Sequence, residues 1–145
     1  FFLFAVLFWV INNNSRIIMT ILLVCALIAV IMPYVARIPA IIEMNKLGGY
    51  DNKHPRQQQT QLTGLGARAL AAHQNCFESL AVFAVALAAV LGTNNVNAVT
   101  ETLAMTHIVA RILFCTFYYL NLDIIRSITW LVGIGTAIGM IAVSL

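Results

Sequence analysis

The chain has 145 residues, of which 61% are hydrophobic and only 9% are charged, and its formal net charge at pH 7 is +3. A soluble protein is usually about 45–50% apolar and about 25% charged, so this composition excludes an ordinary soluble domain. The Lys and Arg residues are scattered, without a cluster of the kind that binds nucleic acid, and we expect no nucleic-acid partner. The composition therefore predicts an integral membrane protein in contact with membrane lipids.

Four apolar segments are each long enough to cross a bilayer, which takes about 20 residues in a helix. They cover residues 17–35, 65–91, 99–120 and 124–145. A polar loop over residues 37–63 separates the first two segments, and short polar turns separate the others. The expected fold class is all-α, an integral membrane four-helix bundle formed as one domain over residues 19–145.

The start of the chain needs separate treatment. The apolar stretch from Phe1 to Ile11 is too short to span a bilayer, and the first methionine is Met19. Residues 1–18 are therefore upstream or expression-derived sequence, an extension of the first helix, or an interfacial anchor. The sequence leaves these three alternatives open.

Basic residues predict the orientation, because Lys and Arg in short loops are retained on the cytoplasmic side. The first loop carries Arg37, Lys46, Lys53 and Arg56, and the third turn carries Arg126, whereas the second turn has neither Lys nor Arg. We therefore expect the first loop and the third turn to face the cytoplasm.

The cysteines Cys25, Cys76 and Cys115 all fall inside apolar segments, in an odd number and without the spacing of a metal site. We expect them to be reduced packing residues, and we expect no bound metal.

The second apolar segment contains the polar residues of "RALAAHQNCFESLAVF", residues 68–83. A charged side chain at the centre of a membrane helix costs on the order of 2.5–3.5 kcal/mol, so such residues usually pair inside a bundle or line a polar cavity. At about 100° per residue, Arg68 and Asn75 lie about 20° apart on one helix face, with Glu78 about 60° further round. These three side chains can point into one site. His73 lies about 140° from Arg68 and is expected to contact another helix or a neighbouring subunit.

Four side chains of the third segment share an arc of about 60°: His107, Arg111, Phe114 and Tyr118. Arg111 and Glu78 have opposite charges on different helices and are expected to pair. Two interpretations stay open. Either the polar residues form a buried network that only fixes helix packing, or the excess of cation over the one buried carboxylate binds an anionic ligand.

Residues 68–83 resemble the second-helix signature of the MAPEG family, the membrane-associated proteins in eicosanoid and glutathione metabolism, in which an Arg precedes Asn-x-x-Glu and a late Phe. Residues 107–130, "HIVARILFCTFYYLNLDIIRSITW", are similar to the family's second motif. In that motif an Arg is followed by a Tyr two turns later, then by Arg-Ser at the start of the last helix and by an aromatic residue. Both motifs stand in the family's order, and the resemblance covers residues 19–145.

The resemblance implies a homotrimer whose active sites lie between adjacent subunits, open toward the cytoplasm, and bind glutathione as a co-substrate. The implied glutathione-binding residues are Arg68, Asn75, Glu78, Arg111, Tyr118 and Arg126, and the implied catalytic residues are Arg126, Ser127 and Tyr118. An arginine-rich pocket with one glutamate complements the carboxylates and the ammonium of glutathione. Arg126 and Ser127 would stabilise the thiolate, and a lipophilic electrophile or hydroperoxide would arrive from the bilayer.

Some positions depart from the family pattern. The best-characterised members carry a further basic residue where this chain has Ala71, Ala72 and Gln74, many have Tyr at the position of Phe114, and Trp130 stands where an aromatic residue, often Tyr, is common. These departures favour a divergent bacterial-type member, located in the bacterial inner membrane.

The predicted function is that of a membrane-bound glutathione-dependent transferase or peroxidase acting on lipophilic electrophiles or hydroperoxides. A non-catalytic membrane subunit of the same fold, with a structural polar network, is an alternative. A small proton- or ion-conducting bundle is a third, less favoured because no broken helix and no repeat between the halves can be recognised.

Overall fold

A computed structural model of the chain describes the backbone of residues 2–145 and the side chains of residues 15–145. The helices, in chain order, are α1 (Phe2–Ala36), α2 (Ile38–Lys46), α3 (Pro55–Gln59), α4 (Gly64–Gly92), α5 (Ala98–Tyr119) and α6 (Asp123–Ala142). Within the described residues, four spans are long and apolar enough to cross a membrane: Ser15–Lys46, Gly64–Gly92, Ala98–Tyr119 and Asp123–Ala142. These spans confirm the predicted all-α membrane bundle of four long helices.

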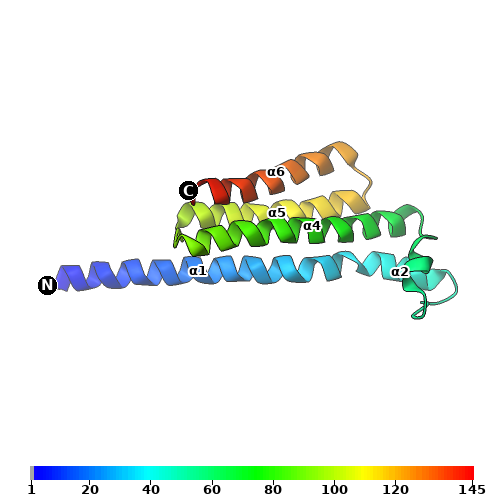
Figure 1. The fold of residues 1–145 in the computed structure, drawn as a ribbon, viewed down its shortest axis with the longest axis horizontal. Coiled ribbons are helices and arrows are strands. Elements are labelled where there is room, and N and C mark those ends of the chain that lie inside the picture. Colours follow the sequence, from blue (N-terminus) through cyan, green and yellow to red (C-terminus); the bar gives the residue numbers. More distant parts are fainter. Residues whose placement is uncertain (1) are drawn as a thin grey trace.

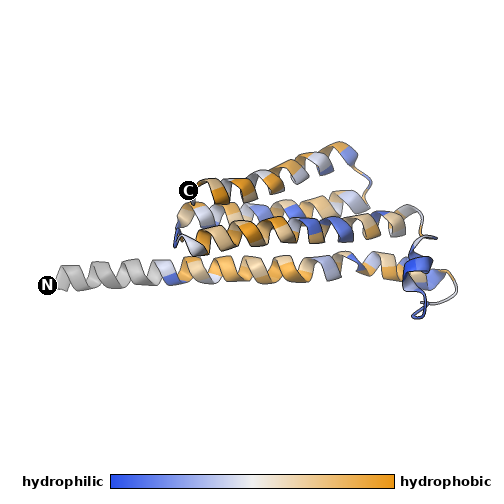
Figure 2. Cartoon of the chain, in the orientation of Figure 1, coloured by the Kyte–Doolittle hydropathy of each residue, from blue (hydrophilic) through white to orange (hydrophobic). Residues whose placement is uncertain are grey.

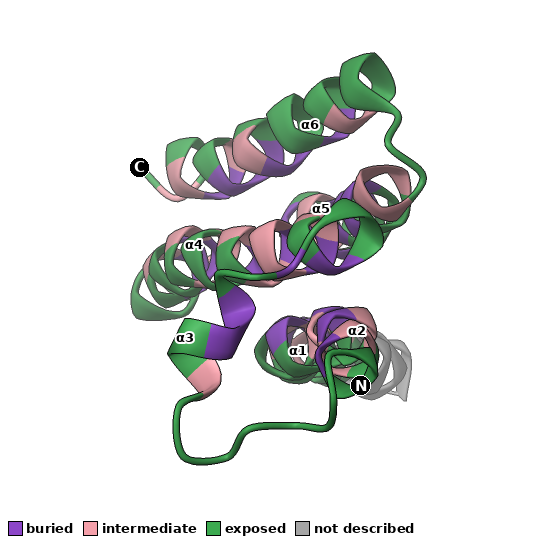
Figure 3. Cartoon of the chain, turned by 90° about the vertical axis from the view of Figure 1, so that its right-hand side faces the viewer, coloured by how far each residue is buried: buried purple, intermediate pink, exposed green. Residues whose placement is uncertain are grey.

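The middle of the bundle is formed by α4 and α5, which lie between α1 and α6 (Figure 1). The view along the bundle shows the same order, with α1 and α2 on one side of α4 and α5 and with α6 on the other (Figure 3). Many large apolar side chains point outward from these helices, among them Val85, Val109 and Leu131. Such an apolar outer face is suited to contact with lipid, and the backbone polar groups form their hydrogen bonds inside each helix.

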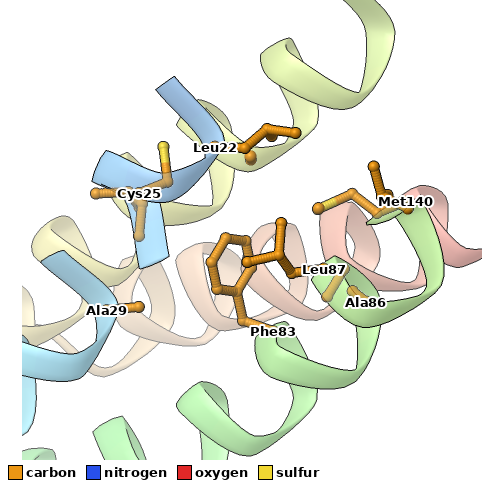
Figure 4. Packing of buried hydrophobic residues seen from close by; sticks show 11 residues of the cluster. Leu22, Cys25, Ala29, Phe83, Ala86, Leu87 and Met140 are labelled. Atoms are coloured by element: carbon orange, nitrogen blue, oxygen red, sulfur yellow. The ribbon is translucent and has the colours of Figure 1, made fainter. Parts of the chain in front are cut away.

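A hydrophobic core of buried residues joins α1, α4, α5 and α6 (Figure 4). It contains Leu22 and Cys25 from α1, Phe83 and Leu87 from α4, and Met140 from α6. Hydrophilic residues gather instead at the end that carries α2 and α3, and they continue into the middle of α4 and α5 (Figure 2). The core therefore joins the four long helices, and the polar site lies between this core and the polar end.

The first half of the predicted polar loop is helical, which corrects the boundary expected from the sequence. After a break at Arg37, α2 extends the first span to Lys46. Pro39 lies in the first turn of α2, where a missing N–H is not needed for an intrahelical hydrogen bond. The apolar side of this helix, with Ala40 and Met44, is buried against α4. The sequence therefore predicted a loop where the structure has a short helix with one apolar face.

The carbonyl group of a proline near the end of α1 is hydrogen-bonded to a histidine from another helix. Pro33 lies inside α1, and its carbonyl oxygen is 2.7 Å from Nδ1 of His73 on α4. The expectation that His73 contacts another helix is confirmed. Phe1 and the side chains of residues 1–14 lie outside the described residues, so the three alternatives for residues 1–18 stay predictions.

Both α4 and α5 end in the same tight motif, which keeps the following turns short. Asn94 and Asn121 adopt left-handed conformations, with φ of 56° and 60°. The next residue after each asparagine donates its N–H back to a carbonyl of the last helical turn, Asn95 to Val90 and Leu122 to Phe117, each over 2.9 Å. This is the Schellman arrangement, in which Asn is the usual substitute for Gly.

The loop between α2 and α3 is organised by one buried glutamine. Nε2 of Gln58 donates to the carbonyl oxygens of Met44 and Gly49, over 3.1 and 2.6 Å, and Oε1 of Gln58 accepts the N–H of Asp51 over 3.0 Å. The carboxylate of Asp51 in turn accepts the backbone N–H groups of His54 and Lys53, which lowers the pKa of Asp51 below its ordinary value.

Candidate functional site

A chain of hydrogen bonds connects three of the predicted site residues across α5 and α4. Nη2 of Arg111 donates to Oδ1 of Asn75 over 2.7 Å, and Nδ2 of Asn75 donates to Oε2 of Glu78 over 3.0 Å. The expected direct pairing of Arg111 with Glu78 is wrong, because no ion pair between them occurs in the described residues. The amide of Asn75 lies between them, since an amide can accept from the cation and donate to the carboxylate.

Arg111 is the buried centre of this network, with 3% of its surface exposed. Its guanidinium carbon lies 4.2 Å from the centroid of the Phe114 ring, and its Nε is buried without a hydrogen-bond partner. The methylene stem passes close to α6 at Gly133, where a Cβ atom would lie 3.3 Å from Cδ of Arg111. A glycine on α6 therefore leaves the space through which this arginine reaches α4.

Two adjoining cavities border the network, each of about 230 Å³. The first, which we name the His107 cavity, is lined by Asn75, Glu78, Ser79, Val82, His107, Arg111, Trp130 and Ile134. The second, the Arg126 cavity, is lined by Asn75, Phe114, Tyr118, Arg126, Ser127 and Trp130. Each is smaller than a typical ligand pocket of roughly 300–1,000 Å³. The two cavities share Asn75 and Trp130, so they lie side by side.

The Arg126 cavity contains a cation with unused donors. The guanidinium carbon of Arg126 lies 4.4 Å from the centroid of the Tyr118 ring, and the described residues give its N–H groups no acceptor. The Tyr118 ring packs edge-on against Phe114, with ring centroids 5.4 Å apart, while its hydroxyl has no hydrogen-bond partner among the described residues. The hydroxyl of Ser127 is different, because it donates to the carbonyl oxygen of Asp123 over 2.9 Å.

Arg68 is the predicted site residue that the chain does not bring to the cavities. Its Nε donates to the carbonyl oxygen of Tyr119 over 3.2 Å, and it lines neither cavity. Arg68 and Asn75 share a helix face, but two helical turns separate them by about 10 Å along the axis. Angular position alone therefore overestimated how closely these residues cluster.

The sequence profile of the MAPEG family matches residues 21–145. The chain belongs to the MAPEG family. Separate searches of curated proteins and of solved structures gave no match. The matched part of this MAPEG protein includes α2 to α6 and α1 from residue 21 onward, and with them every residue that lines the two cavities.

Two polar residues of this MAPEG protein, Ser79 and His107, line the site without having been predicted as binding or catalytic residues, although the sequence placed His107 on the same helix arc as Arg111. His107 is 2% exposed, stacks on Phe83, and has Nδ1 2.9 Å from the carbonyl oxygen of Gly133 and Nε2 3.1 Å from Oγ of Ser79. A carbonyl only accepts, so the hydrogen-bond pattern assigns the proton to Nδ1 and makes Ser79 the donor to Nε2. The spacing in the sequence could have indicated both residues. Ser79 stands four residues after Asn75, and His107 stands four residues before Arg111, so each lies one helical turn from a predicted site residue.

The described residues of this MAPEG protein hold no group of three or more His, Cys, Asp or Glu side chains that could bind a metal ion.

Proposed function

We propose that this protein is a membrane-bound glutathione-dependent transferase or peroxidase that acts on lipophilic electrophiles or hydroperoxides. The observation that carries the proposal is the hydrogen-bonded chain of Arg111, Asn75 and Glu78 beside two adjoining cavities, one of which contains the unpaired guanidinium of Arg126. Membership of the MAPEG family supports the same chemistry, because glutathione-dependent enzymes occur in that family.

The charges of the site fit glutathione as a co-substrate. Glutathione carries two carboxylates and one ammonium, and the free donors of Arg126 suit a carboxylate or a thiolate. Glu78 is exposed and receives its only hydrogen bond in the described residues from Asn75, so one carboxylate oxygen is left for the ammonium. Arg68 keeps both Nη groups for a carboxylate that extends toward the polar end of the bundle.

The thiol of glutathione would supply the nucleophile for conjugation or for peroxide reduction. Arg126 lines a cavity together with Tyr118, and its positive charge would favour the thiolate. We assign the hydrogen bond to the sulfur to the hydroxyl of Tyr118, because this hydroxyl has no partner in the described residues whereas that of Ser127 is bonded to the α6 backbone. This assignment changes the role that the sequence predicted for Ser127.

The apolar lining of the His107 cavity supports a lipophilic second substrate. Val82, Ile134 and Trp130 form this lining, next to the polar edge made by Asn75 and Glu78. We propose that the active unit is a homotrimer with the sites completed at subunit contacts. Light scattering corrected for detergent should then give a protein mass three times that of the 15.9 kDa chain.

We further propose that the polar end of the bundle faces the cytoplasm in a bacterial inner membrane. The loop before α4 and the turn before α6 lie at the same end (Figure 1). Lys53, Arg56 and Arg126 belong to this end, and such a concentration of basic residues is typical of the cytoplasmic side. Trypsin should cleave at Lys53 in inverted membrane vesicles and leave it intact in right-side-out vesicles.

One observation favours a second function, that of a non-catalytic subunit with the same fold. Arg111 is almost fully buried and already bonded to Asn75, and Asn75 is bonded to Glu78, so the three side chains are linked to one another without a ligand. Polar contacts of this kind stabilise membrane bundles by about 0.6–2 kcal/mol each. Ligand binding, rather than the network itself, separates the two functions.

The test is glutathione binding to the purified, detergent-solubilised protein, measured by calorimetry and by difference absorbance in the thiolate band. The parent, Arg126→Ala and Arg56→Ala are compared, because Arg56 is an exposed arginine outside both cavities. We expect saturable binding and a thiolate signal for the parent and for Arg56→Ala, and loss of the thiolate signal for Arg126→Ala. A chloronitrobenzene and cumene hydroperoxide then distinguish conjugation from peroxide reduction.

Absence of binding at millimolar glutathione in the parent would reject the enzymatic proposal and favour the non-catalytic subunit. A thiolate signal that persists in Arg126→Ala would reject the role of Arg126 while leaving glutathione as co-substrate.

A further inference from the structure

Two cysteines from different helices meet directly behind the polar network. Sγ of Cys76 on α4 and Sγ of Cys115 on α5 lie 3.3 Å apart, and both side chains are buried. A disulfide has a sulfur separation of about 2.05 Å, so the two sulfurs must approach by about 1.2 Å to form one. Neither the glutathione chemistry nor the hydrogen-bonded chain of Arg111, Asn75 and Glu78 uses these thiols.

A small void lies between Cys76 and the candidate site. It has a volume of about 10 Å³ and is lined by Cys76 together with Ser79, His107, Arg111 and apolar residues. Ser79, His107 and Arg111 also line the His107 cavity, so these three side chains form the wall between the cavity and the thiol. A void of this size is close to that needed for a single water molecule, which limits the reagent that can reach Cys76 to a very small one.

We propose that Cys76 and Cys115 are a redox-active dithiol pair that a small hydroperoxide oxidises to a disulfide between α4 and α5. In the first step the sulfur of Cys76 attacks one peroxide oxygen, the O–O bond breaks, and a sulfenic acid and water or an alcohol form. In the second step the thiol of Cys115 attacks the sulfur of Cys76 and releases water. The two thiols lose two electrons in total, and the hydroperoxide gains them.

The geometry favours this order of attack. The thiolate is the reactive form of cysteine, and a nearby positive charge favours it. Arg111, which lines the void together with Cys76, carries such a charge. Cys115 does not line the void, but it is already within contact distance of Cys76, so it can act as the resolving thiol. The pair is independent of glutathione, and the inference therefore goes beyond the proposed function.

The third cysteine provides a matched control inside the same molecule. Cys25 on α1 is 4% exposed, comparable to the 2% of Cys76 and the 7% of Cys115. It packs in the hydrophobic core with Leu22 and Phe83, it has no sulfur partner among the described side chains, and it does not line the void. If burial alone governed oxidation, the three thiols would react alike.

The experiment uses the purified full chain in detergent, without glutathione, and hydrogen peroxide as the probe. After catalase treatment the protein is denatured, alkylated with N-ethylmaleimide and weighed by intact mass spectrometry, and peptide mapping locates any disulfide. We expect the parent to change from three alkylated thiols to one, with Cys76 linked to Cys115, and dithiothreitol to restore all three. Cys25→Ser should change from two alkylated thiols to none.

The variants Cys76→Ser and Cys115→Ser should form no disulfide within the chain. Should either fail to fold, the parent and Cys25→Ser still decide the matter, because mapping identifies the linked residues. The pair should be consumed at least tenfold faster than Cys25. Retention of all three thiols, consumption of Cys25 at the rate of the pair, or disulfides formed only between chains would each overturn the proposal.

Discussion

Arg111 on α5 donates a hydrogen bond to the side chain of Asn75 on α4, across 2.7 Å, and this contact joins two helices inside the candidate site. Because Nε of Arg111 is buried without a partner, Asn75 is the main acceptor for a guanidinium that is only 3% exposed. The relationship makes Asn75 a support for a buried charge as well as a candidate ligand of glutathione.

Replacing Asn75 by leucine should destabilise the bundle measurably. The change leaves the guanidinium of Arg111 without its side-chain acceptor, and an unpaired buried group costs on the order of 1–3 kcal/mol. The midpoint of thermal unfolding, followed by circular dichroism in detergent, should fall. Gln74→Leu is the matched control, because Gln74 is the exposed neighbour of Asn75. Equal midpoints for the two variants would mean that Arg111 finds another acceptor.

Tyr118→Phe and Ser127→Ala should differ in their effect on catalysis. Phenylalanine keeps the ring under the Arg126 guanidinium and removes only the hydroxyl. Losing a hydrogen bond to a charged sulfur costs about 1.5 kcal/mol or more, so kcat/KM with a chloronitrobenzene should fall about tenfold in Tyr118→Phe. Ser127→Ala should stay within about twofold, because the Ser127 hydroxyl bonds to the backbone. The opposite ranking would return the thiol contact to Ser127.

The membrane-spanning helices could be predicted closely because hydropathy and length are properties of the sequence itself. The second segment, expected over residues 65–91, is α4 at Gly64–Gly92, and the third, expected over 99–120, is α5 at Ala98–Tyr119. The prediction was wrong at α2, a helix with one apolar face and one polar face that follows a break at Arg37. Its burial depends on contacts with α4 that hydropathy does not describe.

The site was predicted less completely, because a helical wheel gives the direction of a side chain but not its partner. The face shared by Asn75 and Glu78 was right, and so was the arc that places Arg111 over Phe114. The bridging role of Asn75 could not be derived, since it depends on the distance between α4 and α5. Family motifs supplied the remaining site residues, whose roles stay predictions.

Gly133→Ala should destabilise the protein, whereas Gly135→Ala should not. A Cβ at position 133 would lie 3.3 Å from Cδ of Arg111, while at position 135 no heavy atom lies within 4 Å in the described residues. Overpacking costs about 1–3 kcal/mol, and alanine gains up to about 1 kcal/mol over glycine in a helix. Thermal unfolding should therefore show a lower midpoint for Gly133→Ala only. Similar losses in both variants would indicate that Gly135 contacts another subunit.

Gln58→Leu should open the loop between α2 and α3 without unfolding the bundle. The substitution removes the partner of the Gly49 carbonyl oxygen and of the Asp51 N–H, and it removes one of two donors to the Met44 carbonyl oxygen, which keeps the N–H of Leu47. If the loss of these bonds lowers the free energy of loop opening by about 1.4 kcal/mol, the population of the open loop rises about tenfold. The rate of slow proteolysis follows that population. Trypsin should thus cleave at Lys53 about tenfold faster in Gln58→Leu than in the parent. Gln57→Leu changes the exposed neighbour of Gln58 and should cleave at the parental rate, and equal rates in all three proteins would show that Gln58 does not hold the loop closed.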